Sequence, residues 1–261
     1  MNPALADLQL YPFQRLAALK AGIQPNEKYP NHIALSIGEP KHQPPEFIVE
    51  ALSDSSAVQS SLGSYPATRG AAELRGSIGA WISRRFSAEL DPETQILPVN
   101  GTREGLFSFA QTLLSGAPGS VALLPNPFYQ IYEGAVLLRG AQPVFLPTTK
   151  ANGYKPDFRA VPAATWERCE ILFICSPGNP SGAVLQTEEL AHLLELRDRY
   201  NFVIAADECY SEIYDPDSAP PTGLLEVCAA TNRPDFRGCM VFHSLSKRSN
   251  LPRTKVWFCC R

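Results

Sequence analysis

Four short runs of uninterrupted apolar residues constrain the fold of this chain more than any other feature. Helical patterns alternate with them along the sequence. Unbroken apolar runs of this length are typical of parallel strands that are buried on both faces. The runs are Val121–Leu124, Ile171–Ile174, Phe202–Ala206 and Cys239–Phe242. The sequence therefore predicts an α/β domain in which helices cover a mostly parallel sheet.

Further elements are predicted around these strands. Ile96–Val99 is a short strand candidate, and a helix follows it from Thr102. A later helix has Thr187 as its predicted N-cap, and a short amphipathic helix near the N-terminus spans about Phe13 to Leu19. The inward-facing residues are predicted to be Leu106, Phe107, Ala110, Leu113 and Leu114 in the helix from Thr102, and Leu190, Leu193 and Leu194 in the helix after Thr187.

Composition and charge exclude several classes of protein. The 261 residues are 44% hydrophobic and 19% charged, as in ordinary soluble globular proteins. The net charge of −3 gives no electrostatic footprint for nucleic acid or anionic lipid, and no apolar run approaches the length of a membrane span. The N-terminus lacks the features of a signal peptide, and the seven cysteines form no C-x-x-C pair, so we expect a cytoplasmic protein. The four histidines do not cluster, so no metal site is expected.

Polar segments directly follow the predicted strands, at the ends where ligands of α/β sheets bind. Asn100–Arg103 follows the strand that ends at Val99 and opens a helix. Free N–H groups and the positive end of the helix dipole would suit a phosphate there, although a simple N-cap turn is the alternative. Cys175–Gly182 is rich in proline and glycine, and Asn179 within it could offer its amide to a ring oxygen. A tight strand-to-helix connection is the alternative.

Asp207 stands at the mouth of the third apolar run, followed by Glu208, Cys209 and Tyr210. A buried carboxylate requires a cationic partner, and a protonated pyridine nitrogen would provide one. A magnesium-binding acid of a nucleotide-binding protein is disfavoured because the chain contains neither G-x-x-x-x-G-K-[ST] nor G-x-G-x-x-G. Lys247 closes the last apolar run, where a lysine is placed to form a Schiff base with an aldehyde cofactor. A solvated surface lysine is the alternative.

Together and in this order, the segments resemble the class I/II (fold type I) aminotransferases that depend on pyridoxal 5′-phosphate. The matching motifs are G-E-P (38–40), Y-x-x-x-x-G (65–70), N-G-T-R (100–103), N-P-F-Y (126–129), N-P-S-G (179–182), D-E-C-Y (207–210) and S-L-S-K (244–247). The sequences of two segments, L-S-I-G-E-P-K-H and H-S-L-S-K-R-S-N-L-P, are most similar to those of bacterial succinyldiaminopimelate aminotransferases. The resemblance implies a homodimer that transfers an amino group between an amino acid, N-succinyl-diaminopimelate or glutamate, and a 2-oxo acid in lysine biosynthesis.

The resemblance also implies roles for individual residues. Lys247 would hold the cofactor and move the proton between Cα and C4′, and Asp207 would keep the pyridine nitrogen protonated. Tyr210 and Asn179 would bind the ring oxygen, and Tyr129 would stack on the ring. The remaining implied contacts are Gly101, Thr102, Arg103 and Ser244 at the phosphate, Tyr65 at the phosphate of the partner subunit's site, and Gly38 with Asn179 at the substrate.

Three parts of the chain are expected from the resemblance: an arm with part of a small domain (1–45), an incomplete cofactor-binding large domain (46–252) and an aberrant tail (253–261). After Pro252 the family usually continues Gly-Leu-Arg-Ser-Gly-Phe-Val-Ala-Gly. One choice of codons for Arg253–Arg261 encodes that family sequence when its first nucleotide is dropped. We therefore expect that a single-nucleotide frameshift produced the tail and truncated the chain.

The altered tail has physical consequences. Lys255 stands where the family has a phosphate-binding arginine, and it offers a point charge in place of a bidentate fork. The family strand after the lysine loses its usual sequence, although Val256–Cys259 is β-prone and could replace it. An inactive fragment that at most binds pyridoxal phosphate is therefore the alternative to an active aminotransferase.

Overall fold

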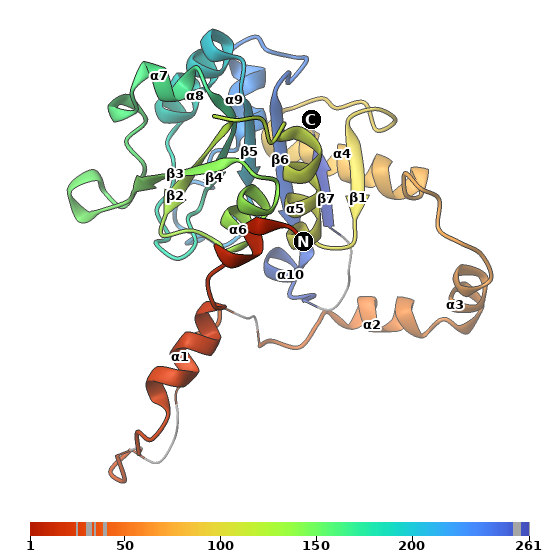
Figure 1. Cartoon of the computed structure of the whole chain (residues 1–261). Helices are drawn as coiled ribbons and strands as arrows, with labels where there is room; N and C mark the ends of the chain where they lie inside the picture. Colours follow the sequence, from red (N-terminus) through yellow and green to blue (C-terminus); the bar gives the residue numbers. More distant parts are fainter. Residues whose placement is uncertain (25, 30–32, 34, 39–40, 253–256, 261) are drawn as a thin grey trace.

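The computed structural model describes residues 1–24, 26–29, 33, 35–38, 41–252 and the backbone of 257–260. A seven-stranded sheet lies between two layers of helices (Figure 1), which confirms the predicted α/β class. The strands are β1 (Ile96–Val99), β2 (Val121–Asn126), β3 (Gln142–Pro147), β4 (Cys169–Cys175), β5 (Val203–Asp207), β6 (Cys239–Ser244) and β7 (Trp257–Cys260). The helices are α1 (Pro12–Lys20), α2 (Glu46–Ser53), α3 (Ser55–Leu62), α4 (Ala72–Phe86), α5 (Thr102–Leu113), α6 (Ile131–Leu138), α7 (Ala163–Trp166), α8 (Thr187–Tyr200), α9 (Leu224–Ala230) and α10 (Leu245–Arg248). Short 3₁₀ turns span Pro3–Ala6, Lys150–Asn152 and Phe158–Ala160.

The strand order is β1-β7-β6-β5-β4-β2-β3. The four apolar runs form β2, β4, β5 and β6, which pair in parallel as predicted. Asp207 pairs with Phe242, so the carboxyl ends of β5 and β6 lie side by side. β3 was not predicted, because its sequence Gln-Pro-Val-Phe-Leu-Pro has prolines at its second and last positions and no long apolar run. Proline is tolerated there because β3 is the edge strand.

The tail forms an interior strand of this sheet, next to the edge strand β1. The backbone of β7 pairs antiparallel with β1 on one side and with β6 on the other. Trp257 lies opposite both Val99 and Ser244 in the two registers. The β-prone tail thus forms the strand that the sequence suggested, while Lys255 and Val256 lie outside the described residues.

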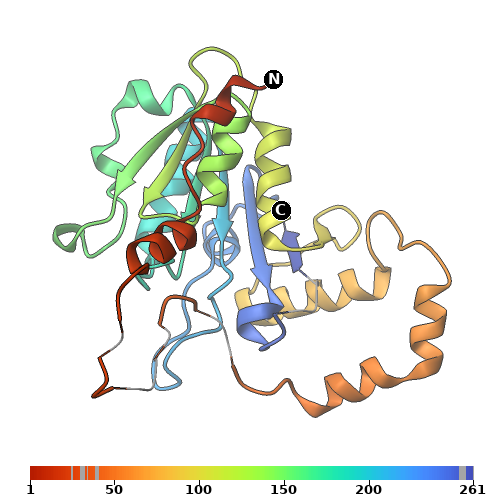
Figure 2. The same cartoon turned by 60° about the horizontal axis from the view of Figure 1, so that its bottom comes forward.

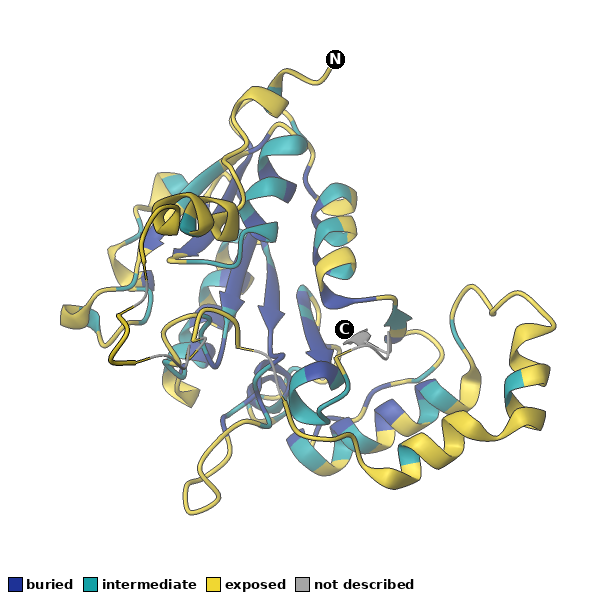
Figure 3. Cartoon of the chain, turned by 90° about the horizontal axis from the view of Figure 1, so that it is seen from below, coloured by how far each residue is buried: buried dark blue, intermediate teal, exposed yellow. Residues whose placement is uncertain are grey.

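Alternate residues of the central strands pack into two cores. Val121 and Leu123 face the layer of α4, α8 and α9, whereas Ala122 and Leu124 face α5 and α6. Figure 3 shows these strands as the buried centre of the molecule. The buried residues of α8 are Leu190, Leu193, Leu194 and Arg197, which confirms the three predicted leucines.

Two details of the helix predictions were wrong. Leu113 is 39% exposed, because α5 packs through Leu106, Ala110 and Leu114, and Leu113 lies beside that stripe. Thr187 is the first helical residue of α8, and its N-cap is Gln186. The backbone N–H of Gln186 donates to the Glu189 carboxylate over 2.7 Å, so the helix starts one residue earlier than hydroxyl capping suggested.

The N-terminal helices lie outside the main body. α1 is the predicted helix near Phe13, but none of its residues is buried, and α2 and α3 extend away from the sheet (Figure 2). Among the described residues, the first buried one is Arg75 in α4. Within the same described part, no helix combines the length and the apolar character that crossing a bilayer requires.

Candidate active site

A hollow of about 570 Å³ opens at the carboxyl ends of the central strands. This volume is within the range of small-molecule sites. It brings together nine of the predicted site residues: Gly38, Thr102, Arg103, Tyr129, Asn179, Asp207, Tyr210, Ser244 and Lys247. Gly101 adjoins them as the N-cap of α5. Tyr65 does not line the hollow and is 99% exposed after α3.

Asp207 lies at the base of this site, at the end of β5, with 6% of its surface exposed. Its carboxylate accepts from the Tyr132 hydroxyl over 2.7 Å and from the backbone N–H of Cys209 over 3.3 Å. Burial raises the pKa of Asp207. No salt bridge to it occurs among the side chains that the structure describes. A buried carboxylate with neutral donors is suited to a cation brought by a ligand.

Tyr132 of α6 is a site residue that the sequence reasoning missed. It is fully buried and stacks on Phe173, with ring centroids 4.8 Å apart, and meets Tyr129 edge-to-face at 5.9 Å. Burial and the nearby Asp207 hold the pKa of Tyr132 well above its usual value, so its hydroxyl stays a donor. The available signal was its spacing of three residues from Tyr129.

An anion-binding corner lies where α5 and α10 begin. Gly101 is the N-cap of α5 and has a φ of 143°, a value that glycine adopts easily. The free backbone N–H groups of the first turn of α5 follow directly after it. The Ser244 hydroxyl ends β6 and lies 2.8 Å from the Ser246 hydroxyl. Arg103 donates from Nε to the Tyr129 hydroxyl over 2.8 Å, and this hydrogen bond raises the pKa of the guanidinium. Hydroxyls, backbone N–H groups and a fixed positive charge therefore converge here.

Lys247 reaches the hollow from α10. Its ammonium donates to the backbone carbonyl of Gly38 and lies 5.9 Å from the centre of the Tyr210 ring. Burial, and then Asp207, raise the pKa of Tyr210. Tyr11 and Phe13 also line the hollow, although sequence reasoning treated that segment only as an arm. Tertiary packing brings these two residues to the hollow, and no local sequence pattern predicts such packing.

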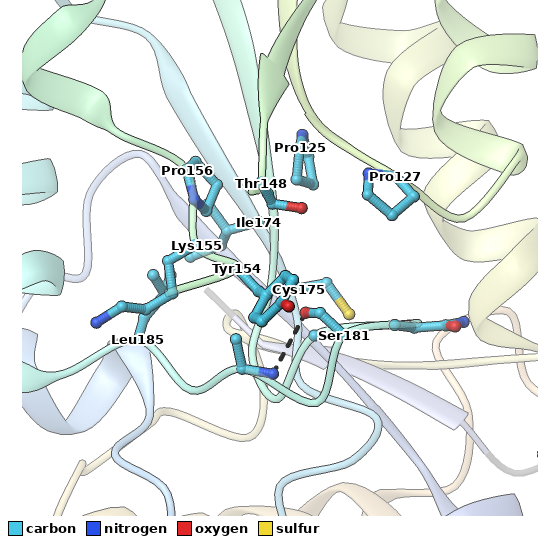
Figure 4. Close-up of a pocket in the computed structure, with 13 residues that line it drawn as sticks. Pro125, Pro127, Thr148, Tyr154, Lys155, Pro156, Ile174, Cys175, Ser181 and Leu185 are labelled. Atoms are coloured by element: carbon cyan, nitrogen blue, oxygen red, sulfur yellow. Dashed lines mark hydrogen bonds between the residues drawn. The ribbon is translucent and has the colours of Figure 1, made fainter. Parts of the chain in front are cut away.

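A second cavity (Figure 4) shares Pro127 and Asn179 with the lining of the hollow. Its volume is about 20 Å³, which is room for about one water molecule. Ser181 turns toward it, and its hydroxyl accepts from the Ala183 backbone N–H over 3.3 Å. A pyridine ring does not fit this space, so the larger hollow is the place for a cofactor.

Comparison with known proteins decides the family. The profile described as aminotransferase class I and II matches residues 30–260. The chain belongs to this family. A solved aminotransferase from Neisseria meningitidis Z2491 superposes with a TM-score of 0.91 and 43% identity, covering 100% of this chain and 65% of that one. AspB, an aminotransferase from Helicobacter pylori 26695, gives a TM-score of 0.88 and 36% identity over 97% of this chain and 64% of its own.

Among curated relatives, the LL-diaminopimelate aminotransferase of Nitratidesulfovibrio vulgaris (strain DSM 19637 / Miyazaki F) is 33% identical over 253 residues. That match covers 97% of this chain and 62% of the relative. The chain therefore spans about three fifths of the length of the curated relatives it matches.

The cofactor of this aminotransferase family is pyridoxal 5′-phosphate. The residues present fit it: Asp207 accepts from neutral donors and has no cationic partner among the described side chains, and the corner at α5 suits a phosphate. Lys247 is the amine that faces the same hollow. Within the described residues, no group of three or more His, Cys, Asp or Glu side chains is arranged to hold a metal ion.

Proposed function

We propose that this chain binds pyridoxal 5′-phosphate through Lys247 and serves amino-group transfer between an amino acid and a 2-oxo acid. The observation that carries the proposal is the placement of Lys247 and Asp207 in one hollow, on neighbouring strand ends. An amine for the aldehyde and an acid for the ring nitrogen are the two groups that this chemistry requires on opposite ends of one ring.

Each residue has a definite task in this proposal. When bound, the cofactor supplies an aldehyde and an electron-accepting ring. Lys247 holds it covalently and then carries the proton at the substrate Cα. Asp207 stabilises the protonated ring nitrogen, and Tyr132 keeps the Asp207 carboxylate oriented. Tyr129, Tyr210 and Asn179 orient the ring, and Gly101, Thr102, Arg103 and Ser244 bind the phosphate.

The substrate is the finer part of the proposal. We assign N-succinyl-diaminopimelate and glutamate, with Gly38 and Asn179 beside the substrate, in lysine biosynthesis. The motif wording and the LL-diaminopimelate aminotransferase relatives support this class. The proposal also includes a cytoplasmic homodimer in which Tyr65, fully exposed, reaches the partner subunit's site. Residues 1–45 act as the arm and 46–252 as the cofactor-binding domain.

Pyridoxal phosphate added to the purified protein tests the proposal. We expect a new absorbance band that is lost in Lys247→Ala and kept in Lys155→Ala, whose lysine pairs with Glu189 outside the hollow. Amino transfer to 2-oxoglutarate is then measured with N-succinyl-LL-diaminopimelate, LL-diaminopimelate and other amino acids. A band without transfer would favour the alternative, a fragment that only binds the cofactor. Wild-type protein without a band would contradict the proposal.

A further inference from the structure

Two buried ionisable residues lie directly behind the candidate active site. Glu208 follows Asp207 at the end of β5, and His243 precedes Ser244 in β6. They are 5% and 1% exposed. The backbone N–H of Glu208 donates to the carbonyl of Phe242 over 3.0 Å, so the two strand ends are already adjacent.

The side chains extend that adjacency through several elements. Glu208 Oε2 lies 3.6 Å from His243 Nε2, and Glu208 Oε1 accepts from the Leu224 N–H at the start of α9 over 2.7 Å. The His243 ring meets Trp81 edge-on at 5.0 Å and stacks on Phe86 at 5.4 Å. The pair thus joins β5, β6, α4 and α9 behind the hollow.

We propose that Glu208 and His243 form a buried clamp, a pair of positioning residues that fixes the ends of β5 and β6 and hence the spacing between Asp207 and the Ser244–Lys247 turn. This inference rests on the proposed function, because the spacing matters for a cofactor held between these groups. Neither residue lines the hollow itself, so both act through their neighbours.

The charge state follows from the surroundings. Burial raises the pKa of Glu208 to about 8 and lowers the pKa of His243 to about 3. Arg85, Glu226 and Asp207 face Glu208, while Arg248 and Arg85 face His243. Arg85 is itself paired with Glu212 over 2.9 Å. The raised pKa of Glu208 and the lowered pKa of His243 both favour the uncharged form of each side chain at neutral pH.

A neutral clamp has a functional consequence. An ionised Glu208 would place a second negative charge beside Asp207 and disfavour its charged form. Keeping Glu208 protonated lets Asp207 be the carboxylate that meets the protonated ring nitrogen.

Glu208→Gln, Glu208→Ala and the control Glu73→Gln, at an exposed glutamate in the first turn of α4, test the clamp. Glutamine reproduces a protonated glutamic acid in shape and hydrogen bonding, so we expect its dissociation constant for pyridoxal phosphate to stay within about twofold of wild type. Alanine should weaken binding about tenfold or more and shift the pH midpoint of the absorbance of the bound cofactor. Equal weakening in Glu208→Gln and Glu208→Ala would overturn the proposal, because it would mean that the negative charge is needed.

Thermal unfolding of the cofactor-free protein gives an independent measurement. When the pKa of a buried acid is higher in the folded protein than in the unfolded chain, folding stability falls as the pH rises from the unfolded pKa to the folded pKa. Wild type and Glu73→Gln should therefore lose melting temperature between about pH 5 and about pH 9 more steeply than Glu208→Gln. If the melting temperatures of wild type and Glu208→Gln depended on pH in the same way, the proposal that Glu208 is protonated in the folded protein would be overturned. Wild type that binds no cofactor would instead refute the proposed function, while these curves still decide the clamp.

Discussion

Asp207 is buried and accepts hydrogen bonds from neutral donors. The residues of the candidate site around it differ in how readily the sequence reveals them, because strands place some of them and helix packing places others. Asp207, Asn179 and Lys247 were predictable because each stands at or just beyond the end of an apolar run, where a strand of a parallel sheet delivers its ligand-binding residues. Tyr132 and Tyr11 were not, because the packing of α6 and of the N-terminal segment places them there. A sequence shows where strands end more readily than which helix packs beside them.

Tyr132→Phe tests the donor to Asp207. The variant keeps the ring stacked on Phe173 and removes the 2.7 Å hydrogen bond. Hydrogen bonds to charged groups contribute about 1.5–3 kcal/mol, so we expect pyridoxal phosphate to bind roughly tenfold more weakly, measured by absorbance titration. Tyr154→Phe is the control, because Tyr154 lies in the small second cavity. Unchanged affinity in Tyr132→Phe would show that Asp207 needs no such donor.

Gly223 offers a packing test beside the clamp. A Cβ at this position would lie 2.6 Å from the buried ring of Phe86 and 3.1 Å from the Glu208 carboxylate. Overpacking of this kind costs about 1–3 kcal/mol, so Gly223→Ala should lower the free energy of unfolding in a denaturant titration. Gly76→Ala is the matched control, since a Cβ there meets nothing within 4 Å inside α4. Gly76→Ala should stabilise by about 0.5–1 kcal/mol. Equal stability changes would contradict the close packing.

At the scale of elements, the strands differ in how clearly the sequence marks them. β2, β4, β5 and β6 are buried on both faces, so their apolar runs are unbroken. β3 is an edge strand with prolines at its second and last positions, and its pattern is correspondingly weak. β7 was expected only from the β-propensity of its residues, and its backbone closes the gap between β1 and β6.

Cys259→Pro tests the role of β7. Position 259 pairs with Leu97 of β1 and Phe242 of β6, so proline removes an N–H between two strands and is expected only at edges or bulges. We expect a loss of about 3 kcal/mol or more in unfolding free energy and visible aggregation, since freed strand edges template association. Cys259→Ala keeps the backbone N–H and should behave like wild type. A stable, soluble Cys259→Pro protein would show that β7 adds little to the sheet.

At the scale of the whole molecule, the resemblance predicted the layered α/β body, and the superposition on solved aminotransferases confirms it. The sequence did not predict that the helices α1, α2 and α3 would all stay uncovered while Tyr11 and Gly38 line the hollow. α1, α2 and α3 contain no buried residue, although α2 carries the apolar side chains Phe47, Val49 and Leu52 on its surface. The amphipathic pattern near Phe13 predicts that α1 is helical, but such a pattern does not specify what covers the apolar face.

Limited proteolysis tests the difference between the exposed helices α1 to α3 and the packed body that begins at α4. Trypsin cleaves exposed, loosely packed backbone first, because the chain must open locally to enter the protease. Arg69 has a side chain that is 55% exposed, whereas Arg75 is buried and donates to the carbonyls of Pro92 and Gly70. We expect early cuts between Arg15 and Arg69 and a resistant product that begins at Gly70, identified by mass spectrometry. Arg69→Gln should move the last early cut to an upstream lysine and leave the product otherwise unchanged. Early cleavage inside residues 75–250 would contradict the separation between the exposed N-terminal segment and the packed body.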